Sequence, residues 1–434
     1  MTEIQFLETS QKNFYPELKK LLSVKETKAE ETERVVLEIL EAVKSQGDAA
    51  VLKYTKRFDK NDASTVKKLA LGHDEFHSAL KQIPQERRNA LEHSAERIRD
   101  YAEHQKLHSW EYEDANGNKL GQKITPVDSV GIYVPGGRAA YASSVLMNAI
   151  PAKVAGVENL IMVSPATSGK LNEMVLAAAA IAGVDIAYQI GGAQAIAALA
   201  YGTSTISAVD KIVGPGNTYV AIAKQKVFGD VGIDMIAGPS EVVVVCDGIT
   251  NPDWVAMDLL SQAEHDENAR AILIATKQPY IQQVQKSIEK FINKLPRAEI
   301  IKKSLSSNGI FIKVENLQEA SEVVNFLAPE HLELFLEDAD SILPLIRHAG
   351  AIFLGEYTPE VFGDYCAGPN HVLPTMGTSR FSSPLGVYEF QKRTSIIKCS
   401  SLGAQALADT AATMAESEGL DAHALAAKFR IEEK

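Results

Sequence analysis

The stretch "LSQAEHD" at positions 260–266 places an amide and an imidazole at the end of an apolar run, "PDWVAMDLL". Gln262 and His265 are three residues apart, so on a helix they would project from the same face. Taken alone, this pair fits a solvated helix end better than a metal site. The rest of the chain has to decide between these two interpretations.

Two later stretches carry side chains of the same kind. In "LAPEHLELF", Glu330 and His331 follow Pro329, and the residue before a proline disfavours helix, so we expect a helix-to-strand junction there. "PEVFGDYCAGPNHVLPT" holds three further candidates, Asp364, Cys366 and His371. Imidazole, carboxylate and amide oxygen together suit a zinc-like ion. A fourth ligand would have to come from the C-terminal tail, which offers Glu418 and His423.

Three glycine-rich turns form a second candidate site. "YVPGGRAA", "IGGAQAIAAL" and "VGPGNTYVA" each follow a predicted strand and open a predicted helix. Glycine permits close backbone approach, and free N–H groups at helix starts favour phosphate. Each turn alone is explained as well by a tight turn, and the G-x-G-x-x-G fingerprint is missing. Their shared place at strand ends favours a nucleotide site of a non-standard kind.

Composition sets the frame for these sites. The 434 residues predict two or three domains, and 45% hydrophobic with 23% charged residues is typical of an ordinary soluble globular protein. The net charge of −12 argues against a nucleic-acid partner. The acidic N-terminus lacks an apolar signal region, and no run is long enough to span a membrane. Three scattered cysteines make no disulfide framework, so we expect a cytoplasmic enzyme.

The order of predicted elements indicates an α/β fold. The first third is mainly helical, and from Val127 short β-branched runs alternate with alanine-rich helices. A second such set begins after "AGPS". Together they predict two Rossmann-like, doubly wound modules with parallel sheets, plus helical N-terminal elements. Residues 364–400 are expected to form loop rather than core, and a small helical tail follows that must dock on the body or on a second subunit.

Several motifs then resemble one enzyme family. They are "SVGIYVPGG", "GGAQAIAALAYGT", "DKIVGPGN", "AGPSEV", "DLLSQAEHD", "PEHLEL" and "GDYCAGPNHVLPT". Over nearly its whole length the chain resembles the histidinol dehydrogenases. The resemblance implies oxidation of L-histidinol through L-histidinal to L-histidine, the last step of histidine biosynthesis. It also implies NAD and one Zn²⁺ per active site as cofactors, and an intertwined homodimer with shared active sites.

The resemblance assigns roles residue by residue. The zinc ligands would be Gln262, His265, Asp364 and, from the partner's tail, His423. Glu330 and His331 match the catalytic acid–base pair. Substrate contacts would come from the ligands with Ser240, His331 and Glu418. Tyr133, Gln194 and Asn217 match the NAD-binding positions, and they fall on the three glycine turns.

The predicted domains follow from these assignments. Residues 1–25 would be an N-terminal extension, and residues 26–128 with 239–380 an α/β domain that holds zinc and substrate. Residues 129–238 would bind NAD, and residues 381–434 would form a tail that docks on the partner subunit.

A mechanism can be predicted on the same basis. His331 would take the hydroxyl proton as hydride leaves, and Glu330 would activate the water that hydrates the aldehyde. Because histidinol carries an imidazole and an amine, the zinc is expected to orient the substrate more than to polarise it. Zinc, manganese and cobalt all accept this ligand set.

Alternatives remain at this stage. A Cys366 thiohemiacetal is a less favoured route to the acid, since no nearby cation in the sequence would lower the thiol pKa. A zinc hydrolase would leave the glycine turns unused, and a non-catalytic binding module would have no need of Glu330 and His331.

Overall fold

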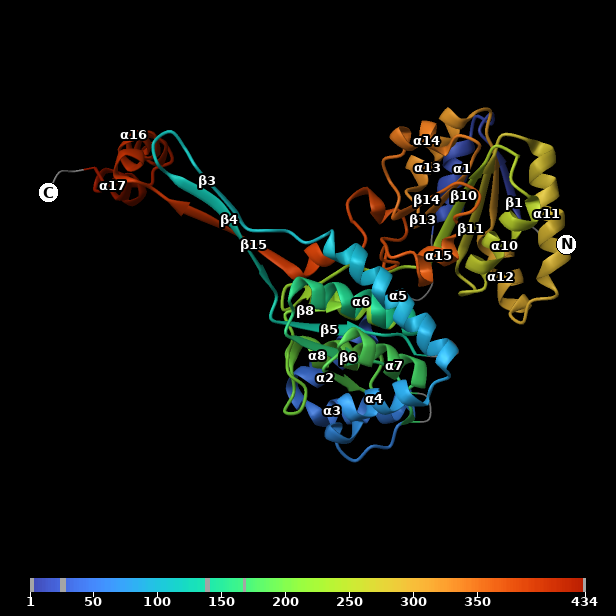
Figure 1. Cartoon of the computed structure of the whole chain (residues 1–434), viewed down its shortest axis with the longest axis horizontal. Helices are drawn as coiled ribbons and strands as arrows, with labels where there is room; N and C mark the ends of the chain where they lie inside the picture. Colours follow the sequence, from blue (N-terminus) through green and yellow to red (C-terminus); the bar gives the residue numbers. More distant parts are fainter. Residues whose placement is uncertain (1–3, 24–28, 137–140, 167–168, 432–434) are drawn as a thin grey trace.

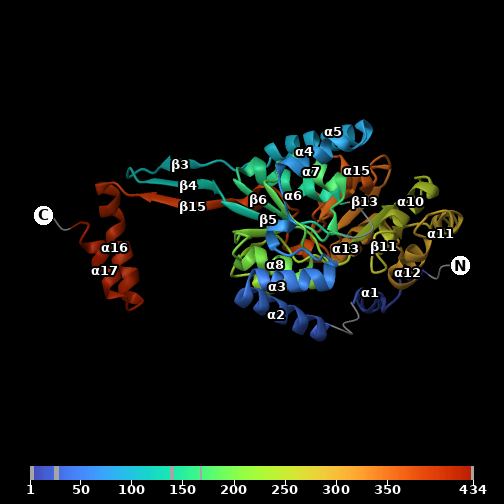
Figure 2. The ribbon, with the colours of Figure 1, turned by 90° about the horizontal axis from the view of Figure 1, so that it is seen from below.

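The computed structural model describes residues 4–23, 29–136, 141–166 and 169–431, which form two α/β modules and a projecting arm (Figure 1). The first module surrounds the sheet that contains the glycine turns. The second surrounds the sheet that contains Glu330 and His331. The arm carries the C-terminal helices away from both (Figure 2).

The first module is built on a six-stranded sheet that is parallel except at one edge. In spatial order its strands are β2 (Ala70–Leu71), β7 (Ile186–Tyr188), β6 (Asn159–Val163), β5 (Ser129–Tyr133), β8 (Lys211–Val213) and β9 (Gly232–Ile233). Only β2 runs antiparallel to its neighbour. One face is covered by α4 (His73–Gln82), α5 (Gln85–Glu103), α6 (Ala142–Ala155) and α7 (Glu173–Ala182), and the other by α2 (Ala29–Gln46), α3 (Asp48–Tyr54), α8 (Gly192–Tyr201) and α9 (Thr218–Val227).

The second module has an all-parallel sheet. Its strands in spatial order are β1 (Gln5–Glu8), β12 (Ile310–Lys313), β11 (Arg270–Ala275), β10 (Glu241–Cys246), β13 (His331–Phe335) and β14 (Ala351–Leu354). The central strand "EVVVVC" is buried throughout, as a parallel strand covered on both faces should be. The covering helices are α10 (Pro252–Ala263), α11 (Gln278–Ile292) and α12 (Ala298–Asn308) on one face, with α1 (Phe14–Leu22), α13 (Leu317–Leu327) and α14 (Ala339–Ile342) on the other.

Both modules share one strand order. Counting only the strands from β5 and from β10 onward, each sheet runs third, second, first, fourth, fifth. This is the doubly wound order, in which the chain reverses direction beside the first strand. In each module one extra strand from the N-terminal region lies beside the third strand. The predicted fold class, two doubly wound modules with added helical elements, is confirmed.

The N-terminal elements divide between the modules differently from the prediction. Residues 26–128 were grouped with 239–380, but α2 packs on α8 and α9, α4 on α7, and α5 on α6, all in the first module. Residues 1–25 are more than an extension, since β1 pairs with β12 and α1 buries Phe14 and Leu18 under the second sheet. Helical periodicity shows which face of a helix is buried, but not which sheet it covers.

The arm is a three-stranded antiparallel sheet with two helices at its tip. It consists of β3 (Trp110–Glu113), β4 (Lys119–Pro126) and β15 (Gln391–Lys398), followed by α16 (Ser401–Ser417) and α17 (Asp421–Lys428). The two predicted tail helices are confirmed. Their own buried core comprises three alanines, while Ile397, Leu402, Met414 and Phe429 are at least 60% exposed.

The segment 364–400 contradicts the expectation of loop rather than core. Asp364 lies on the short helix α15 (Glu360–Tyr365), and β15 closes the segment. Between them, Val372, Leu385, Val387 and Phe390 are buried in the core of the first module. Glycine and proline indicate irregular backbone, but irregular backbone can still pack. Within the described ranges, no helix combines the length and apolar character needed to cross a membrane.

Candidate functional site

Glu330 and His331 meet where α13 gives way to β13. Ala328 ends the helix in the left-handed region with φ of 49°, and Pro329 follows, so the backbone turns sharply before the strand begins. As a result, Glu330 Oε2 lies 3.8 Å from His331 Nδ1, although neighbours within a strand point to opposite faces. The expected irregular junction is present, and it brings both side chains to one place.

The hydrogen bonds of His331 define which ring nitrogen is free. Nδ1 lies 3.1 Å from the carbonyl oxygen of Glu241, and a carbonyl can only accept, so Nδ1 carries the proton. Nε2 is buried and has no hydrogen-bond partner, with Asp364 Oδ1 3.8 Å away. Burial lowers the pKa of His331 to about 4, so the imidazole is neutral at pH 7. Nε2 is therefore a free base that faces the candidate ligands.

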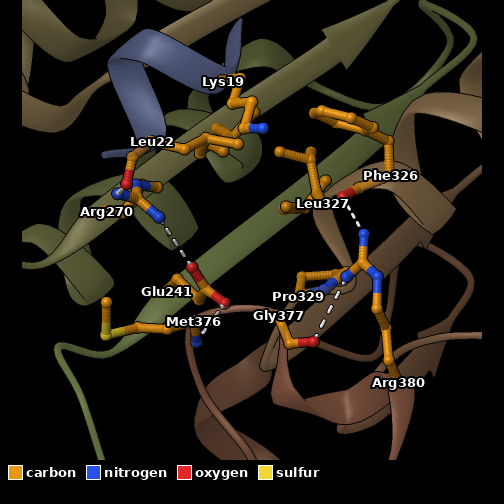
Figure 3. Close-up of a pocket in the computed structure, with 12 residues that line it drawn as sticks. Lys19, Leu22, Glu241, Arg270, Phe326, Leu327, Pro329, Met376, Gly377 and Arg380 are labelled. Atoms are coloured by element: carbon orange, nitrogen blue, oxygen red, sulfur yellow. Dashed lines mark hydrogen bonds and ion pairs between the residues drawn. The ribbon is translucent and has the colours of Figure 1, made fainter. Parts of the chain in front are cut away.

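Glu330 is held by the backbone of Glu241, whose side chain forms a buried ion pair. Its Oε2 accepts a hydrogen bond of 2.9 Å from the backbone N–H of Glu241, and burial raises its pKa. The Glu241 carboxylate in turn pairs with Arg270 at 3.2 Å and accepts the N–H of Met376 (Figure 3). These contacts line a cavity of about 320 Å³, which Lys19 and Arg380 also border. Glu241 thus fixes both Glu330 and His331 through its backbone.

Three ligand atoms converge beside this pair. His265, Glu360 and Asp364 each offer an atom within 4.8 Å of the others. Gln262 points from the last turn of α10, where it is fully buried and neither atom of its amide has a partner. Two carboxylates and an imidazole that converge fit a divalent cation of the zinc type, and an orphaned buried amide three residues before His265 is a further candidate ligand. His265 and Asp364 therefore lie together, while Gln262 lies three residues before His265 at the end of α10, and its place in the ligand set stays a prediction.

Glu360 is a member of this group that sequence reasoning missed. Its Oε1 lies 3.4 Å from His331 Nδ1, and burial raises its pKa, with the charge of Asp364 adding to the effect. Glu360 and Asp364 are four residues apart on α15. That spacing is the signal that would have found it, had the segment been predicted as helix.

His371 also lies here, without having been given a role. Its Nδ1 is 2.8 Å from the backbone oxygen of Asp364, and burial lowers its pKa. Cys366 ends α15, and Arg97 of α5 donates to its carbonyl oxygen. Ser240 directly precedes β10 at the same edge of the sheet, where its carbonyl accepts the N–H of Arg270.

The two predicted residues of the tail are elsewhere in the same chain. Glu418 follows α16 and His423 lies on α17, both exposed at the tip of the arm and remote from α15 (Figure 1). Within one chain the ligand group therefore contains neither of them.

The three predicted nucleotide contacts lie on the first module at the carboxyl ends of its strands. Tyr133 ends β5, and its hydroxyl accepts the N–H of Gly192 at 3.1 Å; burial raises its pKa to about 12. Gln194 is buried on α8 with an unpartnered Oε1. Asn217 caps α9 through a bond from the N–H of Val220.

The glycines around these residues lie where a side chain would clash with its neighbours, so the backbone itself forms the surface. A β-carbon on Gly214 would lie 2.2 Å from the backbone oxygen of Tyr133, and one on Gly136 would lie 2.5 Å from Pro165. Gly191 is equally close to Pro165. With the orphaned Gln194 oxygen, this arrangement fits a bound nucleotide that approaches the backbone closely.

Comparisons with known proteins cover the same regions. The family profile described as histidinol dehydrogenase matches residues 22–431. Histidinol dehydrogenases of Dechloromonas aromatica and Nitrosomonas europaea are 57% and 55% identical over 432 residues, spanning 100% of each chain. A crystal structure of the histidinol dehydrogenase of Elizabethkingia anophelis is 36% identical, covers 99% of this chain and 98% of its own, and has a TM-score of 0.93. The similarity extends through both modules and the arm.

Proposed function

Because the chain belongs to the histidinol dehydrogenase family, and is thereby an oxidoreductase, we propose that it performs the zinc-dependent, NAD-linked oxidation of L-histidinol to L-histidine. The reaction removes four electrons in two steps, with L-histidinal between them. Membership of this family excludes the hydrolase and the binding-only interpretations.

One observation supports the proposal most strongly. The free Nε2 of His331, the raised-pKa carboxyl of Glu330 and the ligand atoms of His265 and Asp364 share one edge of the second sheet. Two groups that can accept protons and a cation site together are what the oxidation of an alcohol with a metal-binding imidazole requires.

The chemistry of the residues present supports a site for each cofactor. Gln262, His265 and Asp364 would hold the zinc ion, with His423 of the partner subunit as fourth ligand, and Glu360 is a further candidate. Tyr133, Gln194 and Asn217 would hold NAD. When bound, the zinc would keep the substrate's imidazole and amine in place, and two NAD molecules, bound one after the other, would each accept one hydride.

The protons are moved by this chain's own side chains. His331 Nε2 takes the proton of the hydroxyl group as the first hydride leaves the carbon, which yields the aldehyde. Glu330, whose pKa is raised by burial, then receives a proton from the water that adds to the aldehyde. Loss of a second hydride and a second hydroxyl proton from the hydrate gives the carboxylate. Glu241 keeps His331 in the tautomer that this sequence needs.

The partner subunit completes the site in this proposal. His423 and Glu418 are exposed on an arm whose tip leaves Leu402, Met414 and Phe429 uncovered. An arm that docks on a second copy would bury these side chains and deliver both residues to the substrate. We further propose a cytoplasmic homodimer with two shared sites.

A tagged-heterodimer experiment tests the cofactors and the shared site together. The wild-type protein should reduce NAD on addition of L-histidinol, and a chelator should abolish the signal. His331→Asn and His423→Asn, each inactive alone, are then co-expressed with different tags and purified through both tags. Such a heterodimer holds one intact site of two, so about half of the wild-type activity should return.

A matched pair of variants provides the control. His331→Asn combined with Glu330→Gln should give no activity, because both changes lie on the body of the subunit and every site carries one. Absence of activity in the His331–His423 heterodimer would contradict the shared site. Chelator-resistant turnover by fully metal-free protein would contradict the role of zinc.

A further inference from the structure

Asp59 lies at the nucleotide face of the first module, although it comes from the N-terminal helical region. It is the last residue of a π-helical turn, Thr55–Asp59, that continues α3. Its Oδ2 accepts the N–H of Gly191 at 3.0 Å and the side-chain amide of Gln194 at 3.4 Å. Single π-helical turns are found frequently at functional sites.

The second oxygen of this carboxylate is Oδ1. Among the described residues, no hydrogen bond and no ion pair reaches Asp59 Oδ1. A β-carbon on Gly191 would lie 3.1 Å from this oxygen and 2.5 Å from the side chain of Pro165. Oδ1 therefore lies over the glycine turn, and Gly191 lies between it and Pro165, the second residue after the end of β6.

The charge of Asp59 changes what α8 can bind. The first N–H groups of a helix normally attract phosphate, but here a carboxylate already occupies this position. A further anion would be repelled, whereas a diol could donate a hydrogen bond to Oδ1. The start of α9 differs, since an amide, Asn217, caps it, and the nearby Asp234 carboxylate is paired with Lys224.

The strand order indicates which part of a dinucleotide would meet Asp59. In doubly wound folds of this order, an acidic residue about 20 residues after the glycine turn, at the end of the second strand, binds the adenosine ribose 2′-hydroxyl. The corresponding end of β6 reads Val163, Ser164 and Pro165, with no acid. Asp59 supplies a carboxylate at this place from another part of the chain.

We propose that Asp59 is a specificity-determining residue, which accepts a hydrogen bond from the adenosine ribose of NAD and repels the 2′-phosphate of NADP. The inference rests on the proposed use of NAD and adds the residue that selects between the two nicotinamide cofactors.

Calorimetric titration of metal-loaded enzyme with NAD and with NADP tests this role, without turnover. The wild type should bind NAD much more tightly. In Asp59→Asn the amide oxygen still accepts the N–H of Gly191, but the charge is gone. The ratio of the Kd for NADP to the Kd for NAD should therefore fall at least tenfold. The ratio of kcat/KM with NAD to kcat/KM with NADP should fall in parallel.

A nearby carboxylate provides the control. Asp62 is exposed in the same segment and pairs with Lys56, so Asp62→Asn should leave the ratio within twofold of wild type. Should Asp59→Asn not fold, as judged by its thermal transition, Asp59→Ser gives the same test with a smaller acceptor. A folded variant that binds NAD with an unchanged ratio would overturn the inference. A wild type that binds neither cofactor would overturn the proposed function itself.

Discussion

The two modules share a strand order, but their candidate site residues lie at opposite ends of the strands. In the first module, Tyr133, Gln194 and Asn217 lie at the carboxyl ends of the strands, where helices begin. In the second, His331 starts β13, and Gln262 lies in the last turn of α10. Strand order alone therefore does not determine at which end of the strands a doubly wound module carries its candidate site residues.

Helix ends account for the difference. Helix N-termini carry partial positive charge and suit a nucleotide with phosphates, while helix C-termini carry partial negative charge and suit a cation. In the second module, the end of α10 is joined by Glu360 and Asp364 from α15. The first module offers backbone N–H groups and glycine, and the second offers ligands and a base.

The largest expected effect comes from the proposed base, His331, in the second module. His331→Asn removes the free Nε2, and loss of a general base typically costs 10²–10⁴-fold, so kcat should fall by about 10³-fold. The Kd for NAD, measured by calorimetry, should stay within twofold because the first module is unchanged. His93→Asn, an exposed histidine on α5, should leave both quantities at wild-type values. A loss of NAD binding in His331→Asn would mean that the two modules do not act separately.

The opposite pattern, weaker binding of NAD with an unchanged metal site, is expected for a variant of the first module. Gln194→Met keeps the volume of a buried side chain but removes the amide whose Oε1 has no partner. The KM for NAD should rise by about tenfold, the order of one lost hydrogen bond to a ligand. Bound zinc, measured by metal analysis of the purified protein, should be unchanged. A variant that keeps its KM for NAD would place the nucleotide elsewhere.

The sequence predicted what depends on local chemistry. The proline before Glu330 predicted the irregular junction, whereas the shared helix face of Gln262 and His265 is not present, because α10 ends at Ala263 and His265 lies in the turn that follows. The alternation of strands and helices predicted both modules. These features depend on neighbours within a few residues, so one sequence carries enough information to predict them.

The remaining features depend on contacts between distant segments. Asp59 is over 130 residues from Gly191, and no pattern around it indicates that it reaches α8. Glu360 was missed because glycine and proline around it suggested loop. The helices of residues 29–103 were assigned to the wrong module, since amphipathic faces of similar width can cover either sheet.

The smallest expected effect concerns a buried carboxyl group on α10, the helix that leads to the candidate cation site. Asp258 lies on α10, and burial raises its pKa from 3.8 to about 7, while its charge adds to the raised pKa of Glu333. A carboxyl group with a raised folded-state pKa binds more protons when folded. Its contribution to stability is complete below pH 3.8 and is lost as the pH rises to about 7. Since asparagine cannot ionise, Asp258→Asn should gain Tm over wild type across this range, by a few degrees near pH 8.

Asp253 on the same helix provides a control of opposite sign. Lys290 and Ser287 lower its pKa through hydrogen bonds, so its stabilising contribution is present above pH 3.8 and is lost as the pH falls through the lowered value. Asp253→Asn should therefore melt below wild type near neutral pH and approach it on acidification. Both series are measured in chelator-treated protein, because a bound cation would favour the ionised carboxylates nearby. If Tm changed with pH in the same way in the two variants, burial would not destabilise the ionised Asp258 carboxylate. Only the candidate ligands would then make this end of the strands suitable for a metal.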